Sequence, residues 1–160
     1  MAFLYIRVTR KRVTRKKISY PRMIGCRPRV GAERLVKLLL IEDDEHVAQM
    51  LAEAFASGGH ETTIRYTGED GLAYLARERP DAVMLDVRLP VLNGVAVLRQ
   101  IRSTDSTLPV IIMTGLATAG EVAEVRRLGV TEIIEKPEVL RHFSEALARI
   151  ASRDRLHDAT

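Results

Sequence analysis

The chain has 160 residues, and its 46% hydrophobic and 29% charged residues are ordinary for a globular domain. No apolar run approaches the roughly 18 residues that a membrane-spanning helix needs, and the single cysteine, Cys26, excludes an intramolecular disulfide and a cysteine-based zinc site. We therefore expect a cytoplasmic protein without a membrane partner. The net charge of +4 is an average, because residues 1–37 hold twelve Lys or Arg and one acid, whereas residues 38–160 carry −7.

The first 34 residues form a basic segment that contains a tandem repeat. The sequence RVTRK occurs at Arg7–Lys11 and again at Arg12–Lys16, and no stable hydrophobic period follows it. High charge and few bulky apolar residues predict a disordered tail over 1–34. Residues 154–160 are expected to form a second, short tail at the other end of the chain.

Two other interpretations of the basic segment stay open. Translation could begin later, at Met23 or at a non-standard start codon near Val30 or Val36, because the composition changes abruptly in this region. The positive charge could instead attract nucleic-acid phosphates without sequence preference. A basic segment with no folded reader is weak support for that role, so a nucleic-acid partner is not the favoured expectation.

Residues 35–153 alternate short apolar runs with amphipathic helical patterns, and we expect one domain there. In chain order, the first predicted elements are a strand at 38–41, a helix from Val47 to the Gly58–Gly59 pair, and a strand at 62–66. A helix at 72–79, a strand at 82–85 and a helix carrying Val95, Leu98 and Ile101 follow. The last are a strand at 110–113, a helix at 122–128, a strand at 130–134 and a helix with Leu140, Phe143, Leu147 and Ile150.

Five predicted strands thus alternate strictly with five predicted helices. Three of the strands, at 38–41, 82–85 and 110–113, are continuous apolar runs, which are typical of strands covered on both faces. Strict alternation favours a parallel sheet with helices on both faces. The sequence therefore predicts an α/β fold built on a doubly wound, five-stranded parallel sheet.

Reactive side chains follow the ends of four of these strands. Glu42 and Asp43 follow the first strand, Asp86 the third, Thr114 the fourth and Lys136 the fifth. The carboxyl ends of parallel strands lie on one edge of a sheet, and ligands bind in the crevice outside them. We therefore expect three carboxylates, one hydroxyl and one ammonium group in one shallow pocket.

These residue types together favour phosphoryl transfer to a carboxylate. Three neighbouring carboxylates repel one another, and Mg²⁺ relieves that repulsion by taking oxygen ligands. A carboxylate polarised by the metal can attack phosphorus. Lys136 and Thr114 are then suited to contact other oxygens of the transferred group.

Four stretches in this order resemble the receiver domain of two-component response regulators: LLLIEDDE, DAVMLDVRLPVLNG, PVIIMTG and IIEKP. The resemblance covers residues 36–153. It implies the flavodoxin-like fold with strand order 2-1-3-4-5 and five helices. It also implies Mg²⁺ as the cofactor, and a phosphoryl group supplied by a sensor histidine kinase or a histidine phosphotransfer protein.

By that resemblance, the phosphoacceptor is Asp86, and the loop after it is shaped by Pro90 and Gly94. Thr114 and Lys136 would contact the phosphoryl group. The implied Mg²⁺ ligands are oxygen atoms of four residues: the carboxylates of Glu42, Asp43 and Asp86 and the backbone carbonyl of Arg88. Only self-catalysed phosphorylation and dephosphorylation are implied, so the chain is not expected to be an enzyme with a separate substrate.

One position departs from the family pattern. Many receivers carry Phe or Tyr three residues before the conserved lysine, and this ring changes rotamer on phosphorylation; here the position is Ile133. Isoleucine offers neither an aromatic face nor a hydroxyl. We therefore expect the switch to work through the loop after Thr114, which is rich in small residues, rather than through residue 133.

The output of the domain is expected to be a protein–protein contact. Only 24 residues follow Lys136 and the last helix uses most of them, so a stand-alone receiver that signals to an unidentified downstream protein is the favoured interpretation. An aspartate-nucleophile phosphatase of the haloacid dehalogenase type is the enzymatic alternative. That class requires a second Asp two residues after the nucleophile, where this chain has Arg88.

Overall fold

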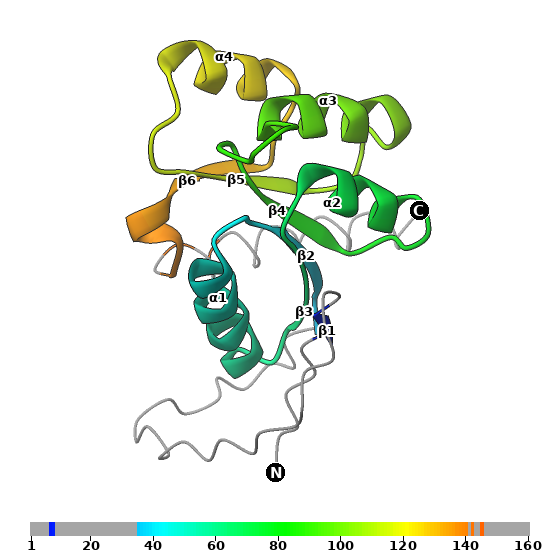
Figure 1. The fold of residues 1–160 in the computed structure, drawn as a ribbon, viewed down its shortest axis with the longest axis vertical. Helices are drawn as coiled ribbons and strands as arrows, with labels where there is room; N and C mark the ends of the chain where they lie inside the picture. The colour runs from blue at the N-terminus through cyan, green and yellow to red at the C-terminus, as the bar shows by residue number, and fades with distance from the viewer. Residues whose placement is uncertain (1–6, 9–34, 141, 143–144, 146–160) are drawn as a thin grey trace.

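The computed structural model describes residues 7–8, 35–140, 142 and 145 (Figure 1). Its strands are β1 (Arg7–Val8), β2 (Lys37–Ile41), β3 (Glu61–Arg65), β4 (Ala82–Asp86), β5 (Val110–Thr114) and β6 (Glu132–Glu135). Its helices are α1 (Glu45–Ser57), α2 (Gly68–Leu75), α3 (Gly94–Thr104), α4 (Ala119–Arg127) and the 3-10 turn η1 (Lys136–Glu138). None of the described helices is long and apolar enough to cross a membrane.

The sheet confirms the predicted topology. All strand pairs are parallel and the order is β1-β3-β2-β4-β5-β6. Without the two-residue β1, this is the predicted order 2-1-3-4-5. Because all of these strands run parallel, the carboxyl ends of the five longer strands share one edge.

Alternation along the strands divides the core into two layers (Figure 1). Leu38 and Leu40 of β2 face the side covered by α1, whereas Leu39 and Ile41 face the side covered by α2, α3 and α4. Successive side chains of a strand point to opposite faces, so a continuous apolar run is needed when both faces are covered. The five residues of β4 and of β5 are all buried for this reason.

Within residues 1–34, for which the sequence predicts a disordered tail, the structure describes Arg7–Val8. These two residues form β1, which pairs with the edge strand β3 through Arg7 opposite Thr63 and Val8 opposite Ile64. An edge strand presents unpaired N–H and C=O groups, and an extended segment of the same chain can satisfy them. The rest of the predicted tail lies outside the described residues, as do residues 154–160.

The fifth predicted helix is described only where it begins. Val139, Leu140, His142 and Glu145 are helical, and Val139 is buried in the layer that contains α1. The other residues on which this prediction rested, Phe143, Leu147 and Ile150, lie outside the described part of the chain.

Helix α2 begins four residues earlier than predicted, at Gly68, and ends at Leu75. The Thr67 side chain accepts a hydrogen bond from the Asp70 amide at 3.1 Å and caps the helix. Gly68 and Gly71 lie in the first turns of α2. A Cβ atom at Gly68 would collide with Val97, and one at Gly71 would collide with Ile41, so glycine is needed for this close packing. Because glycine is unfavourable inside helices, Gly68 and Gly71 hide the start of α2 in the sequence.

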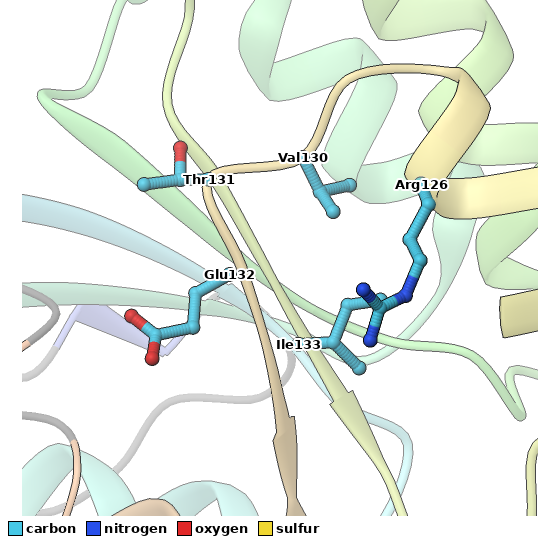
Figure 2. A pocket seen from close by; sticks show the side chains of 5 residues that line it. All are labelled: Arg126, Val130, Thr131, Glu132 and Ile133. Carbon is cyan, nitrogen blue, oxygen red and sulfur yellow. The ribbon is translucent and has the colours of Figure 1, made fainter. Parts of the chain in front are cut away.

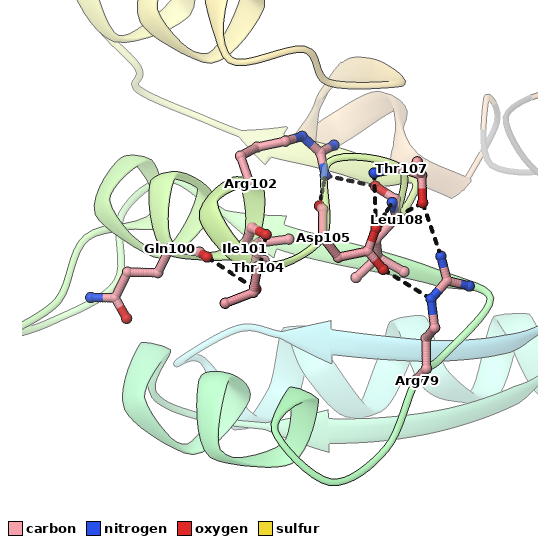
Figure 3. A network of polar contacts seen from close by, with 8 residues as sticks. All are labelled: Arg79, Gln100, Ile101, Arg102, Thr104, Asp105, Thr107 and Leu108. Carbon is pink, nitrogen blue, oxygen red and sulfur yellow. Dashed lines mark hydrogen bonds and ion pairs between the residues drawn. The ribbon is translucent and has the colours of Figure 1, made fainter.

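A polar network joins α3 to its neighbours at the opposite edge of the sheet (Figure 3). The Arg102 guanidinium donates to the carbonyl oxygens of Leu108 at 2.8 Å and of Leu128 and Gly129 at the end of α4, at 3.2 and 2.8 Å. Partial burial alone would raise the pKa of Asp105, but hydrogen bonds from Thr107 and Arg79 outweigh it and hold this pKa well below its usual range. The network therefore fixes the C-terminal end of α4.

Replacing Gly94, the first residue of α3, tests the packing beneath the site. A Cβ atom at Gly94 would collide with the Asp86 carbonyl oxygen and lie 2.8 Å from Val87 Cα, both backbone atoms. We expect Gly94→Ala to lower the free energy of unfolding by about 1–3 kcal/mol in urea denaturation. The matched control is Gly120→Ala in α4, where the nearest atom lies 4.0 Å away. It should leave stability unchanged or raise it by up to about 1 kcal/mol; equal effects of the two substitutions would contradict this account.

Candidate functional site

The carboxyl edge of the sheet brings together the polar residues that the sequence predicted there. Lys136, directly after β6, places its Nζ atom 3.0 Å from Glu42 Oε1 and 2.8 Å from Asp86 Oδ2. Glu42 follows β2 and Asp86 ends the adjacent β4. Lys136 therefore reaches across β5 to contact carboxylates from two central strands.

Glu42 is the most deeply buried acid of this group, with 0% of its surface exposed. Burial raises the pKa of Glu42, and the nearby Asp86 charge raises it further, although the hydrogen bond from Lys136 opposes both. Its Oε2 atom makes no hydrogen bond within the described part of the chain. A buried carboxylate oxygen without a partner is costly, so this atom is suited to a ligand that supplies positive charge.

Three carboxylates form a cluster that fits a divalent cation. One oxygen from each of Glu42, Asp43 and Asp86 lies within 4.8 Å of the others. Asp43 is exposed, whereas Asp86 is 1% exposed, so the cluster opens to solvent on one side. Hard cations such as Mg²⁺ take carboxylate oxygens together with several waters. The donor set and the unpartnered Glu42 oxygen both fit such an ion.

Lys136 stays cationic in this setting. Partial burial would lower the pKa of Lys136, but hydrogen bonds to Asp86 and Glu42 outweigh burial and raise it above the usual value of 10.5. Because the pKa of Lys136 is higher in the folded than in the unfolded protein, its charged amine stabilises the fold fully at any pH below the unfolded pKa. This contribution is lost as the pH rises through the folded pKa. The Lys136 contacts are therefore fully present at neutral pH.

The backbone and the loop after β4 hold the Asp86 carboxylate in place. Asp86 Oδ1 accepts a hydrogen bond from the Arg88 amide at 3.1 Å, while Oδ2 accepts from Lys136.

The loop after β4 contains a tight turn. Leu92 N–H donates to the Pro90 carbonyl at 2.7 Å, which forms a γ-turn around Val91. Val91 has φ of 63°, a strained value for a β-branched residue, and its side chain is 99% exposed.

Thr114 lies at the end of β5 and is buried. Its Oγ1 atom accepts a hydrogen bond from the Ala117 amide at 2.9 Å. Because the oxygen acts as the acceptor in this contact, the hydroxyl proton is available to a further acceptor. Thr114 is therefore placed both to donate to a group at the carboxyl edge and to hold the loop before α4.

One contact of the site was missed by the sequence reasoning. The Arg88 guanidinium donates to the Leu116 carbonyl at 2.7 Å and to Glu121 Oε2 at 3.2 Å. Glu121 also belongs to a capping box with Thr118 at the start of α4. The Thr-x-x-Glu spacing of that capping box can be read from the sequence, but no local signal pairs it with an arginine 33 residues earlier.

Ile133 lines a surface cavity away from this edge (Figure 2). The cavity has a volume of about 310 Å³ and lies between the end of α4 and β6; its lining residues are Arg126, Val130, Thr131, Glu132 and Ile133. Ile133 itself is half-buried and packs against the core layer that contains α3. It therefore supplies core contacts where many receivers present an aromatic side chain.

The raised pKa of Glu42 predicts a pH-dependent effect of Glu42→Gln in the absence of metal. When the folded pKa of a carboxyl is raised, the protonated form favours folding, and that advantage is lost as pH rises above the unfolded pKa of 4.5. We expect Glu42→Gln and the unsubstituted protein to have similar urea midpoints below pH 4.5, and the variant to have the higher midpoint at pH 7. A lower midpoint for the variant at pH 7 would show that the ionised carboxylate stabilises the fold.

Comparison with known proteins gives the same family from sequence and from structure. The family model of the response regulator receiver domain matches residues 38–148. The response regulator MprA of Mycobacterium ulcerans is 30% identical over 123 residues, which are 77% of this chain and 53% of that protein. The chain thus spans about half the length of this curated relative.

Two solved structures share the fold. A response regulator receiver domain protein from Clostridium thermocellum matches with a TM-score of 0.71 at 26% identity, over 76% of this chain and 98% of that one. The receiver domain of a sensor histidine kinase from Pseudomonas aeruginosa PAO1, described with a magnesium ion in its active site cleft, matches with a TM-score of 0.68 at 26% identity, over 74% and 99%. Because the family model also covers more than half of the chain, this protein belongs to the response regulator receiver domain family.

Proposed function

We propose that this protein accepts a phosphoryl group on Asp86 and passes the signal on by protein–protein contact. The observation that carries the proposal is the position of the Asp86 carboxylate, which contacts the Lys136 ammonium at 2.8 Å and forms one cluster with the carboxylates of Glu42 and Asp43. Such a site can bind a cation on one side and a phosphoryl oxygen on the other. The family membership supports the same chemistry.

In the proposed reaction, an Asp86 carboxylate oxygen attacks the phosphorus of a phosphohistidine on the donor protein. A new O–P bond forms as the P–N bond breaks, and the electron pair of that bond stays on the imidazole nitrogen. The Arg88 amide and the Lys136 ammonium orient the Asp86 carboxylate before the attack. Holding the nucleophile in one geometry removes part of the entropic cost of the step.

Lys136 and Thr114 then stabilise the transferred group. Lys136 already lies in contact with the acceptor carboxylate and stays charged, so it can pair with a phosphoryl oxygen as that oxygen approaches. The Thr114 hydroxyl keeps its proton free for a second phosphoryl oxygen. Each contact strengthens as negative charge gathers in the transition state.

Mg²⁺ would supply positive charge that neutralises the crowded oxygens. Glu42, Asp43 and Asp86 offer the carboxylate ligands, and the backbone carbonyl of Arg88 is proposed as a fourth. Glu42 supports this assignment because its Oε2 atom has no other partner among the described residues.

We propose a sensor histidine kinase or a histidine phosphotransfer protein as the phosphoryl donor in the cytoplasm, and an unidentified protein as the downstream target. In this account the domain gains and loses the phosphoryl group only by self-catalysis. A nucleic-acid contact through the basic residues 1–34 stays the alternative. Loss of salt-dependent retention on DNA after deletion of residues 1–31 would support that alternative.

Phosphotransfer profiling against histidine kinases of the host tests the proposal. We expect one kinase to label the protein rapidly, and Asp86→Ala to abolish the label because the nucleophile is gone. Lys136→Ala should reduce the labelling rate by on the order of a hundredfold to a thousandfold, the scale of one lost electrostatic contact to the transferring group. Asp70→Asn, which changes an exposed acid of α2, is the control and should be labelled at the normal rate. Undiminished labelling of Asp86→Ala would sink the proposal.

Added Mg²⁺ should stabilise the fold through the acidic cluster. At about one hundred times its dissociation constant, a ligand that binds only the folded state raises the free energy of unfolding by about 2.7 kcal/mol. We expect this gain, followed by urea denaturation, to be lost in Asp43→Asn and kept in Asp70→Asn. The same gain in all three proteins would place the ion elsewhere.

A further inference from the structure

The outer edge of β3 is largely open to pairing. In the described part of the chain, β1 covers two of the five residues of β3, Thr63 and Ile64. Edge strands are usually protected from pairing by proline, by lysine or by a bulge, but the sequence of Glu61–Arg65 is ETTIR. Its three central residues are β-branched, which favours extended backbone. This edge is therefore suited to pair with a further strand.

Thr62 and Ile64 direct their backbone groups away from β2. The Glu61 N–H donates to the residue before β2, and the Arg65 C=O accepts from the residue after β2, each at 3.0 Å. In a strand, the N–H and C=O of one residue point to one side, and those of the next residue point to the other side. Because Thr62 and Ile64 alternate with Glu61 and Arg65, their N–H and C=O groups point to the outer edge.

The two ends of β3 carry opposite charges on one face of the sheet. Alternate residues of a strand share a face, so Glu61 lies on the same face as Arg65, and Glu61 is exposed. The Arg65 guanidinium lies 4.8 Å from the centroid of the Tyr74 ring of α2 and donates to the Ile64 carbonyl at 2.7 Å. These contacts hold the guanidinium beside the outer edge, and the Ile64 carbonyl keeps a second lone pair for a partner.

A second copy of β3 fits this edge in one antiparallel register. With Thr63 opposite Thr63, Thr62 of each copy faces Ile64 of the other, and each of these pairs exchanges two hydrogen bonds. Glu61 then faces Arg65 of the other copy at both ends of the paired strands. These are non-hydrogen-bonded positions, where side chains lie closest and opposite charges are favourable. The sequence ETTIR is thus self-complementary in charge and in hydrogen bonding.

We propose that the outer edge of β3 is an interface between two copies of this chain, and that Arg7–Val8 competes with the second copy for it. Pairing of an edge with itself closes as a two-fold dimer. Because β1 pairs with the same edge at Thr63 and Ile64, the edge holds either β1 or the second copy. The contact is much smaller than the roughly 20–30 residues a side of a standard interface, so the dimer is weak and concentration-dependent. This inference does not depend on phosphoryl transfer.

The experiment is sedimentation velocity of the full chain over a wide range of concentration, under reducing conditions so that Cys26 does not join two chains. The uncovered variant carries Arg7→Pro and Val8→Pro together with Arg12→Pro and Val13→Pro, because the second repeat carries the same two residues as β1. Proline has no N–H group and is excluded from a strand ladder. The matched control carries only Arg12→Pro and Val13→Pro, which leaves β1 unchanged.

Charge reversal tests the register of the dimer. In the uncovered variant, Glu61→Arg places two arginines opposite each other at both ends of the paired strands and should weaken the dimer by about tenfold. Glu61→Arg combined with Arg65→Glu restores opposite charges and should restore the dimer. Glu78→Arg makes the same change of net charge at an exposed acid outside β3 and should have no effect. The same charge variants of the chain with β1 intact, measured at the highest concentration, give this test even where a proline variant fails to fold.

We expect the Kd of the dimer to be about tenfold lower for the uncovered variant than for the unsubstituted chain, which corresponds to β1 covering the edge about nine-tenths of the time. The matched control should behave like the unsubstituted chain. A folded, uncovered variant that stays monomeric at the highest concentration would overturn the proposal. So would a dimer that Glu61→Arg does not weaken, or assemblies that grow beyond the dimer.

Discussion

The contact of Lys136 with two buried carboxylates is the interaction on which the site depends. Glu42 and Asp86 are 0% and 1% exposed, and each would be costly without a cation beside it. Lys136 reaches both only because β2 and β4 are neighbours and β6 lies on the far side of β5. The sheet order thus places one ammonium group against acids that lie 94 and 50 residues away in the sequence. Removing Lys136 would leave two buried carboxylates without a cation and should destabilise the fold, whereas a bound Mg²⁺ offsets part of the repulsion between the acids.

The two ends of α4 are held by different arginines, one at each edge of the sheet. At the edge opposite the site, Arg102 donates to the Leu108 carbonyl (Figure 3). It also donates to carbonyl oxygens that end α4. At the carboxyl edge, Arg88 holds the first turn of α4 and lies two residues from Asp86. The cavity lined by Ile133 lies at the other end of α4, beside β6 (Figure 2).

Most of the fold and the placement of the site residues could be predicted from the sequence. Continuous apolar runs at 38–41, 82–85 and 110–113 show two-sided burial directly, and the polar residue that ends each run marks the common edge. The start of α2 could not be predicted, because Gly68 and Gly71 fit a helix only when the packing against Val97 and Ile41 is known. The hydrogen bond from the Arg88 side chain to the Leu116 carbonyl joins two loops, and such contacts leave no periodic pattern in the sequence. Pairing of Arg7–Val8 with β3 depends on an open sheet edge, which is a tertiary feature.

Direct location of the phosphoryl group tests the central claim. The protein would be phosphorylated by a histidine kinase with Mg²⁺, reduced with borohydride, which converts an aspartyl phosphate into homoserine, and digested for tandem mass spectrometry. The account predicts homoserine at position 86 and unmodified aspartate at position 43. Homoserine at position 43, or a phosphoryl group that survives borohydride on a hydroxyl or an imidazole, would contradict the assignment of Asp86 as the phosphoacceptor.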